Sequence, residues 1–346
     1  MLKSLNGFVF FLSTIALSCS TAEASAKRSQ WKLDQAEFTG EGPAVMWLNP
    51  SDIASRDLFY GPGGREHQPQ GTFAFVEEDL DGSSPKFVVK DQDGVKWKVK
   101  LGTEARPETA ASRLVWAVGY FANEDYFLPT VKIDGIPQHL HRGRSAITSD
   151  GVARNVRLKR YLPGEKKIGS WKWSEGPFTG TRELDGLRVM MALINNWDLK
   201  DINNAIYQEK HATTGPEQIY MVSDLGASFG GASFAWPVGR SRGNLNAYTK
   251  SRFIRRASPE HIDFNVPARP SILYFFLGPR SYVRRTHLGW VGKHIPRDHV
   301  KWTGELLAQL SQKQIRDAFR AAGYNPAQVE GFSKVVEHRI AELKSL

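Results

Sequence analysis

Alternating apolar and charged residues define the clearest strand in the chain. Between residues 95 and 101, apolar side chains occupy every second position and lysines stand between them, which is the period of a strand with one buried face. A shorter apolar run begins at Phe87, and the Asp93-Gly94 pair that separates the two runs is a hairpin signal. We therefore predict a β-hairpin over residues 87–101. The lysines of its outer face are Lys96, Lys98 and Lys100.

A helical period follows this hairpin and returns later in the chain. Pro107 and Glu108 suit the first turn of a helix, and the spacing of the apolar residues extends it over residues 106–121. The further elements predicted in this way are a strand over 152–162, a helix over 182–196, and helices from about Asp298 that are separated at Gly323-Tyr324-Asn325-Pro326. A small β-rich part therefore precedes a larger, mainly helical part, which predicts an α+β fold.

Length and composition agree with a folded chain of two lobes. The chain has 346 residues, of which 41% are hydrophobic, and a single core is close to dividing at this size. Gly61-Pro62-Gly63-Gly64 is a chain breaker ahead of the first strands. The predicted division is a leader over 1–26, an N-terminal extension over 27–65, an N-lobe over 66–162 and a C-lobe over 163–346.

The first residues have the pattern of an export signal. Lys3 precedes an apolar run over residues 8–17, and Ala24-Ser25-Ala26 is a small-residue cleavage site. We expect cleavage before Lys27 and a periplasmic or extracellular mature protein. Cys19, the only cysteine, also lies in a context that resembles a lipoprotein acylation site, so a lipid anchor there is the alternative. The apolar run is shorter than the roughly 20 residues of a spanning helix, and no transmembrane domain is predicted.

Residues suited to phosphoryl transfer gather after the predicted helix 182–196. Asp198 is followed by Lys200 and, five residues on, by Asn203, and a predicted hairpin then leads to Asp224-Leu225-Gly226. Phosphoryl transfer needs a carboxylate that orients the attacking hydroxyl, and oxygen ligands for magnesium. Asp198 suits the first role, and Asn203 with Asp224 suits the second. Lys200 is placed to neutralise charge on the transferred group.

This order of motifs resembles that of the protein-kinase-like superfamily. It is closer to HipA-type bacterial kinases and phosphoinositide lipid kinases than to ordinary eukaryotic protein kinases. The resemblance implies a two-lobed kinase-like fold, with a small β-rich N-lobe and a larger helical C-lobe, that binds ATP or another nucleotide with Mg²⁺. It further implies that Lys100 is the nucleotide-binding lysine and Glu108 its helical partner. Lys98, on the same strand face, is the alternative to Lys100.

The same resemblance assigns the residues of the later motifs. Asp198 corresponds to the catalytic aspartate, and Asn203 and Asp224 correspond to the metal ligands. The chain departs from the pattern at Asn196-Trp197, where kinases have a histidine-arginine pair, and at Leu225, where they have phenylalanine. No Ala-Pro-Glu element is recognisable, which argues against a regulated activation loop.

Three functions are compatible with these features. The first is an exported kinase that transfers the terminal phosphoryl group of a nucleotide to a hydroxyl of a protein, lipid or small molecule. The second is a kinase-like binding or scaffold protein of the cell envelope without turnover. The third rests on the net charge of +10 and on pairs such as Arg255-Arg256 and Arg284-Arg285, which would suit an anionic envelope surface. No nucleic-acid-reading module is recognisable, and His139 and His141 are predicted to be surface residues rather than metal ligands.

Overall fold

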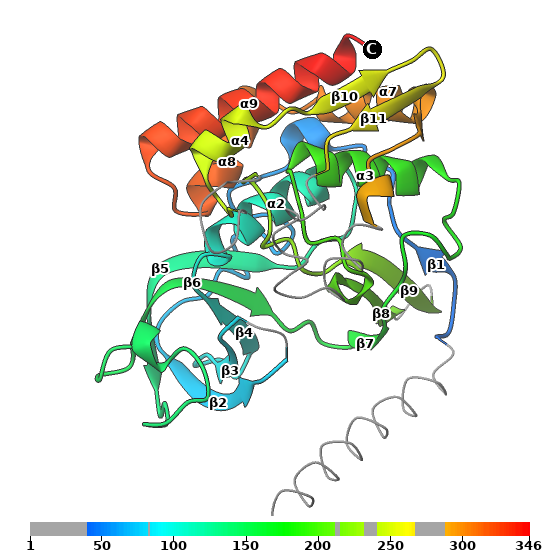
Figure 1. Ribbon diagram of the computed structural model, residues 1–346. Helices are drawn as coiled ribbons and strands as arrows, with labels where there is room; N and C mark the ends of the chain where they lie inside the picture. The colour runs from blue at the N-terminus through cyan, green and yellow to red at the C-terminus, as the bar shows by residue number, and fades with distance from the viewer. Residues whose placement is uncertain (1–39, 82–83, 212–214, 232–240, 267–287) are drawn as a thin grey trace, which may run out of the picture.

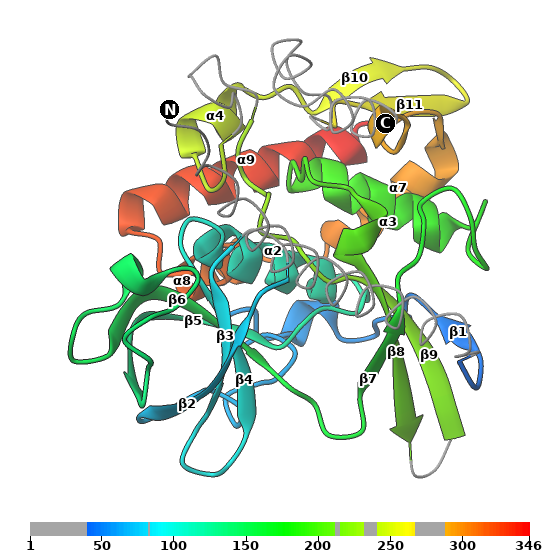
Figure 2. The same cartoon turned by 60° about the horizontal axis from the view of Figure 1, so that its bottom comes forward.

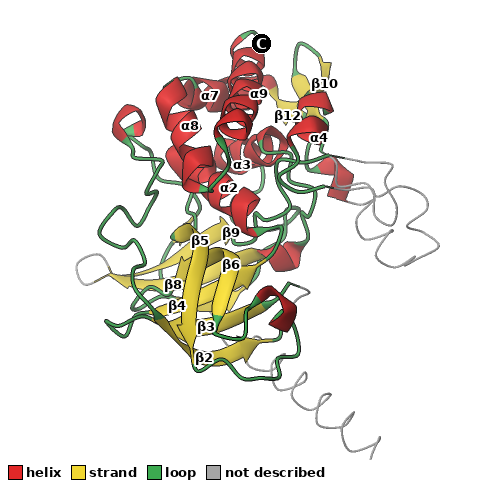
Figure 3. Ribbon diagram, turned by 90° about the vertical axis from the view of Figure 1, so that its left-hand side faces the viewer, coloured by secondary structure: helices red, strands yellow, loops and turns green. Residues whose placement is uncertain are grey.

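The computed structural model describes residues 40–346 except 82–83, 212–214, 232–240 and 267–287. The predicted leader, Cys19 and Arg284-Arg285 lie outside the described residues. Most strands gather at one end of the molecule and most helices at the other, where β10 and β12 also lie (Figure 3). Among the described residues, the structure contains no helix with the length and apolar character needed to cross a membrane.

Five strands close into a barrel in the first half of the chain (Figures 1 and 2). Its order is β2-β3-β4-β6-β5, and β2 and β5 close it by pairing in parallel. The predicted hairpin is confirmed, because β3 and β4 pair antiparallel with Val88 opposite Lys98. The bounds are β2 Phe73–Asp79, β3 Lys86–Lys90, β4 Lys96–Leu101, β5 Asp125–Asp134 and β6 Val152–Arg160.

Alternation along each strand fills the barrel and turns the charged residues outward. Trp97, Val99 and Leu101 of β4 are buried in the barrel core together with Phe87 and Val89 of β3, so the residues between them face out. Helix α2 (Ala105–Ala117) connects β4 to β5 and lies between the barrel and the remaining helices (Figure 1). The outward face of β4 therefore meets α2 and the second half of the chain.

The second half combines a sheet, to which β1 from the start of the described chain adds an edge strand, with a group of helices. Its four-stranded sheet has the order β1-β9-β8-β7, in which the predicted hairpin after Asn204 is formed by β8 and β9. Helices α3, α7, α8 and α9 pack on one large hydrophobic core with α2. The strands are β1 Ala44–Val45, β7 Lys166–Gly169, β8 Asn204–His211, β9 Gly215–Val222, β10 Ile254–Ala257, β11 His261–Phe264 and β12 Ile295–Pro296. The helices are α3 Arg182–Leu193, α4 Leu245–Lys250, α7 Arg297–Leu307, α8 Gln312–Ala321 and α9 Pro326–Lys344.

The predicted α+β class, with a β-rich part before a helix-rich part, is confirmed, although the second part contains more strand than expected. Helix α2 ends at Ala117 and α3 at Leu193, each a few residues before the predicted end. The predicted break between the last helices is confirmed at Gly323, which has φ of 70°. Asn325 then caps α9 through a capping box with Gln328. Short 3-10 helices cover Ile53–Ser55, Arg144–Ala146, Asp201–Asn203 and Leu288–Trp290.

Candidate active site

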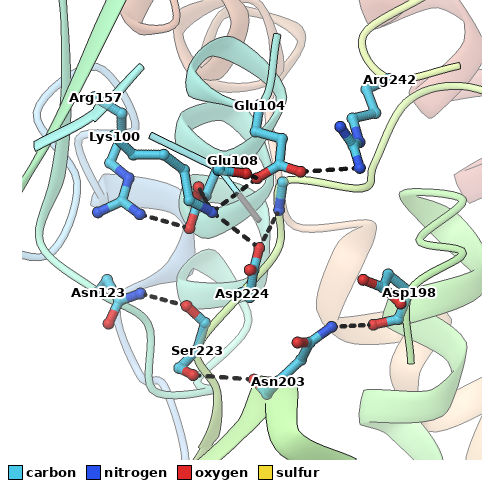
Figure 4. Close-up of polar contacts among 12 residues, drawn as sticks. Lys100, Glu104, Glu108, Asn123, Arg157, Asp198, Asn203, Ser223, Asp224 and Arg242 are labelled. Carbon is cyan, nitrogen blue, oxygen red and sulfur yellow. Dashed lines mark hydrogen bonds and ion pairs between the residues drawn. The ribbon is translucent and has the colours of Figure 1, made fainter. Parts of the chain in front are cut away.

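Lys100 is the centre of a buried cluster of charges (Figure 4). It lies near the end of β4 with a side chain only 3% exposed. Its Nζ lies 2.8 Å from Oε2 of Glu108, 3.0 Å from Oε2 of Glu104 and 3.2 Å from Oδ1 of Asp224. The structure therefore brings together the predicted lysine, its helical glutamate and one predicted metal ligand. Lys98, the alternative lysine, instead pairs with Asp79 at 2.7 Å.

The first turn of α2 places two of these carboxylates. Gly102 has φ of 97°, a left-handed conformation that suits glycine, and turns the chain from β4 into the helix. Glu104 and Glu108 are four residues apart, so they lie on one face of the helical turn. Their charges also suit the positive end of a helix dipole. The lysine and the glutamates are thus brought together by local geometry between residues 100 and 108.

Glu104 was not singled out in the sequence, although it is a central member of the cluster. Besides Lys100, it accepts a hydrogen bond from Ser84 Oγ at 2.9 Å and pairs with Arg242 Nη2 at 3.0 Å. The spacing of four residues from Lys100 and from Glu108 was the only signal available. Glu104 therefore links the turn before β3, the start of α2 and the segment that follows Asp224.

A second buried cation, Arg157, supports the cluster from β6 and was also missed. It is opposite Lys100 in the β4–β6 register. Its Nη2 donates to Oε1 of Glu108 at 2.9 Å, and its Nη1 lies 3.4 Å from Oδ1 of Asp125. Glu108 therefore holds one cation on each carboxylate oxygen, which orients it firmly toward Lys100.

The pKa values of Lys100 and Asp224 are shifted in the directions expected for an ion pair. Burial disfavours the charged form of Lys100, but the charges of Glu108 and Asp224 outweigh this and raise its pKa above the ordinary value. Burial likewise opposes ionisation of Asp224, but Lys100 and the Gly226 N–H, which donates to Oδ1 at 3.1 Å, lower its pKa to about 2. Both groups are therefore charged at neutral pH.

We expect the ion pair between Lys100 and Asp224 to stabilise the fold less as the pH falls. A carboxylate with a lowered folded-state pKa stabilises the fold above its unfolded pKa and loses that effect as the pH falls through the folded value. For Asp224, with an ordinary pKa of 3.8 and a folded pKa of about 2, the loss should begin near pH 4. Urea unfolding of the wild type and of Asp224→Asn from pH 7 to pH 3 should show a shrinking difference in stability. A difference that grows in acid would contradict this assignment.

The loop after β9 is held against the predicted catalytic loop by backbone contacts. The amides of Ser223 and Asp224 both donate to the carbonyl of Asn203, at 2.9 and 3.2 Å, and Ser223 Oγ donates to the same oxygen at 3.0 Å. Asn123 Nδ2 donates to the Ser223 carbonyl at 2.9 Å. The two predicted metal ligands are therefore neighbours through their backbones.

Asp198 and Lys200 form the other half of the site. Lys200 Nζ lies 3.1 Å from Oδ2 of Asp198, and Asn203 Nδ2 donates to the Asp198 carbonyl at 2.6 Å. Asn196 Oδ1 accepts from the Asp198 amide at 2.9 Å, which fixes the turn that follows α3. Figure 4 shows Asp198 on the far side of Asn203 from Lys100. Asn203 therefore connects the predicted base to the metal loop.

The oxygen donors fit a hard divalent cation better at Asp224 than at the full acidic cluster. Carboxylate oxygens of Glu104, Glu108 and Asp224 lie within 4.8 Å of one another, but the ammonium of Lys100 is bound to all three. Asp224 and the amide oxygen of Asn203 belong to adjoining segments and are the ligand types that Mg²⁺ prefers. Of the other candidates, His141 is largely exposed and pairs with Glu78.

Comparison with solved structures finds neighbours of low sequence identity. No family model and no curated protein matches the chain. A Helicobacter pylori proinflammatory kinase, CtkA, aligns over 80% of this chain and 98% of its own, with 9% identity and a TM-score of 0.45. The Golgi casein kinase aligns over 99% of this chain and 95% of its own, with 10% identity and a TM-score of 0.31. Both TM-scores are below 0.5, so the functional argument rests on the geometry of the site.

Proposed function

We propose that this chain is a kinase-like phosphotransferase that transfers the terminal phosphoryl group of a nucleotide to a hydroxyl-bearing acceptor. The observation that carries the proposal is the contact of the buried Lys100 ammonium with Glu108 of α2 and with Asp224 of the loop after β9. A fixed cation beside a carboxylate that can bind magnesium is what the phosphates of a nucleotide require.

Each predicted residue has a role that its contacts support. Lys100 binds donor phosphates, and Glu108, itself held by Arg157, keeps the ammonium in place. Asp224 and Asn203 are the residues that would hold Mg²⁺, which neutralises charge on the phosphate oxygens when bound. Lys100 and Glu108 come from β4 and α2, which pack on buried cores, and Asn203 and Asp224 are held together by backbone hydrogen bonds, so the site is positioned before the donor arrives.

Asp198 and Lys200 act on the acceptor side. Asp198 accepts the proton of the acceptor hydroxyl while the hydroxyl oxygen bonds to the terminal phosphorus of the nucleotide. The bond from that phosphorus to the bridging oxygen breaks, and the nucleoside diphosphate is released. The Nζ atom of Lys200 lies 3.1 Å from Oδ2 of Asp198. During transfer it would bind the phosphoryl oxygens instead, where negative charge increases.

A binding protein without turnover is the second candidate. It is favoured because the proposed catalytic and phosphate-binding side chains form ion pairs with one another: Lys200 pairs with Asp198, and Lys100 pairs with three carboxylates. Nucleotide binding in the absence of phosphoryl transfer would support this candidate, and any transfer that depends on Asp198 would exclude it.

Calorimetric titration with ATP, with and without magnesium, tests the proposal. We expect binding that is strengthened by magnesium, and we expect Asp224→Asn to abolish the magnesium-dependent part because it removes a charged ligand. Asp298→Asn is the matched control, since Asp298 is an exposed residue in the first turn of α7, and it should bind as the wild type does. Wild-type protein that binds no ATP under either condition would overturn the proposal.

A further inference from the structure

Three lysines face the site from neighbouring strands of the barrel. Lys86 of β3 is paired in register with Lys100 of β4, and Lys98 lies one pleat away on the same face of β4. Phe87 and Val89 point into the barrel core, so Lys86 points outward like Lys100. Because Lys100 reaches Asp224 from this face, Lys86 and Lys98 belong to the surface that borders the site.

The backbone around Lys86 is fixed rather than free. The carbonyl of Pro85 accepts a hydrogen bond from the Leu101 amide at 3.1 Å, which ties the start of β3 to the end of β4. Ser84, one residue earlier, donates through Oγ to Glu104 at 2.9 Å. The start of β3 is therefore attached both to the strand that carries Lys100 and to the acidic start of α2.

The charges of the three lysines are compensated unequally. Lys100 has carboxylate partners and Lys98 pairs with Asp79, whereas among the residues that the structure describes Lys86 has no ion pair or hydrogen bond through its ammonium. Burial lowers the pKa of Lys86, and the nearby charges of Lys98 and Lys100 add to this effect against the opposing influence of Asp79. A partly buried cation is thus left beside two others, and an anion placed among them would relieve the repulsion.

We propose that Lys86 and Lys98 are further phosphate-binding residues, which form with Lys100 a three-lysine clamp for the triphosphate of the donor. Lysine ammonium groups bind phosphates as point charges with several donors each. The clamp makes the triphosphate, rather than the base, the main determinant of donor binding. The identification of the ligand as a phosphoryl donor rests on the proposed function, but the clamp itself is a binding property that can be measured without turnover.

Titrations with ATP and with inorganic tripolyphosphate test the clamp. We expect the wild type to bind both, and Lys86→Met to weaken both by about tenfold, the loss expected for one charge-assisted hydrogen bond. Lys90→Met is the matched control, because Lys90 lies on the same strand and face but is exposed; it should change either affinity less than twofold. Lys86→Arg, which keeps the charge, should restore most of the binding, and thermal unfolding should show that all variants are folded.

The outcomes separate the clamp from the proposed function. Equal effects of Lys86→Met and Lys90→Met, tripolyphosphate that fails to bind where ATP binds, or a wild type that binds neither ligand would each overturn the clamp. Transfer from ATP together with unchanged binding by Lys86→Met would leave the proposed function standing without the clamp. Selective loss of triphosphate binding in Lys86→Met, with no transfer by the wild type, would leave the clamp standing without the proposed function.

Discussion

Asp198→Asn is expected to lower the rate of phosphoryl transfer by roughly 10²–10⁴-fold, the usual effect of removing a general base. The change keeps the shape of the side chain, and the contacts of the Asp198 backbone to Asn196 and Asn203 do not involve its carboxylate. Binding of ATP should therefore change little, because Lys100 and Asp224 are untouched. Release of ADP, with water as the acceptor, provides a measurement that does not require the natural acceptor.

The neighbouring Asp201→Asn provides the control for this experiment. Asp201 lies three residues further along in the short helix Asp201–Asn203, so the two variants remove the same charge from the same segment. We expect Asp201→Asn to keep the wild-type rate within about twofold, because the partly exposed carboxylate of Asp201 bonds to the Trp173 backbone rather than to the cluster around Lys100. Equal rates in the two variants would show that Asp198 is not the base, and a wild type that binds ATP without any turnover would favour the binding protein.

The elements that carry Lys100 and Glu108 could be predicted from the sequence. Lys100 and Glu108 are eight residues apart and are placed by the period of a strand and the first turn of a helix, both of which are visible in the pattern. The loop carrying Asp224 follows a strand that the pattern also indicates. For these residues, local periodicity was sufficient to place the strand and the helix, whereas the pairing of Lys100 with Glu108 was implied by the resemblance to kinases, with Lys98 as the alternative lysine.

The distant partners could not be predicted. Arg157 reaches Glu108 only because β6 pairs with β4, and that register depends on the closure of the barrel by β2 and β5. Arg242 reaches Glu104 from a segment 138 positions later in the chain. An isolated arginine in a sequence carries no sign of the carboxylate it will meet, so the ion-pair network becomes visible only in the folded structure.

The end of α3 shows why element boundaries were also missed. The helix predicted from the apolar spacing extends to residue 196, but it ends at Leu193, and Asn195 takes a left-handed conformation with φ of 54°. Arg339 of α9 donates to the Leu193 carbonyl at 2.8 Å and so satisfies a group that the helix leaves free. The turn that brings Asp198 into the site thus depends on a residue more than a hundred positions away.

Arg157→Met should destabilise the fold by about 3–5 kcal/mol, the usual cost of removing one partner of a buried ion pair. Arg157 is 3% exposed, and it contacts Glu108 and Asp125, which are each 1% exposed at the side chain. The substitution leaves two carboxylates buried without their shared cation, and neither can reach water without moving a strand or α2. The free energy of unfolding, measured by urea denaturation, should show the loss.

Two further variants show whether the loss comes from charge. Arg154→Met removes an arginine from an exposed position of the same strand and should change stability by less than about 0.5 kcal/mol. If the cost lies in the carboxylates that lose Arg157, adding Glu108→Gln to Arg157→Met should cost less than the two single changes together, because the double variant also removes one of those carboxylates. Additive losses would mean that packing rather than charge explains the cost of Arg157→Met, and equal effects of Arg154→Met and Arg157→Met would mean that the buried contacts of Arg157 add no stability.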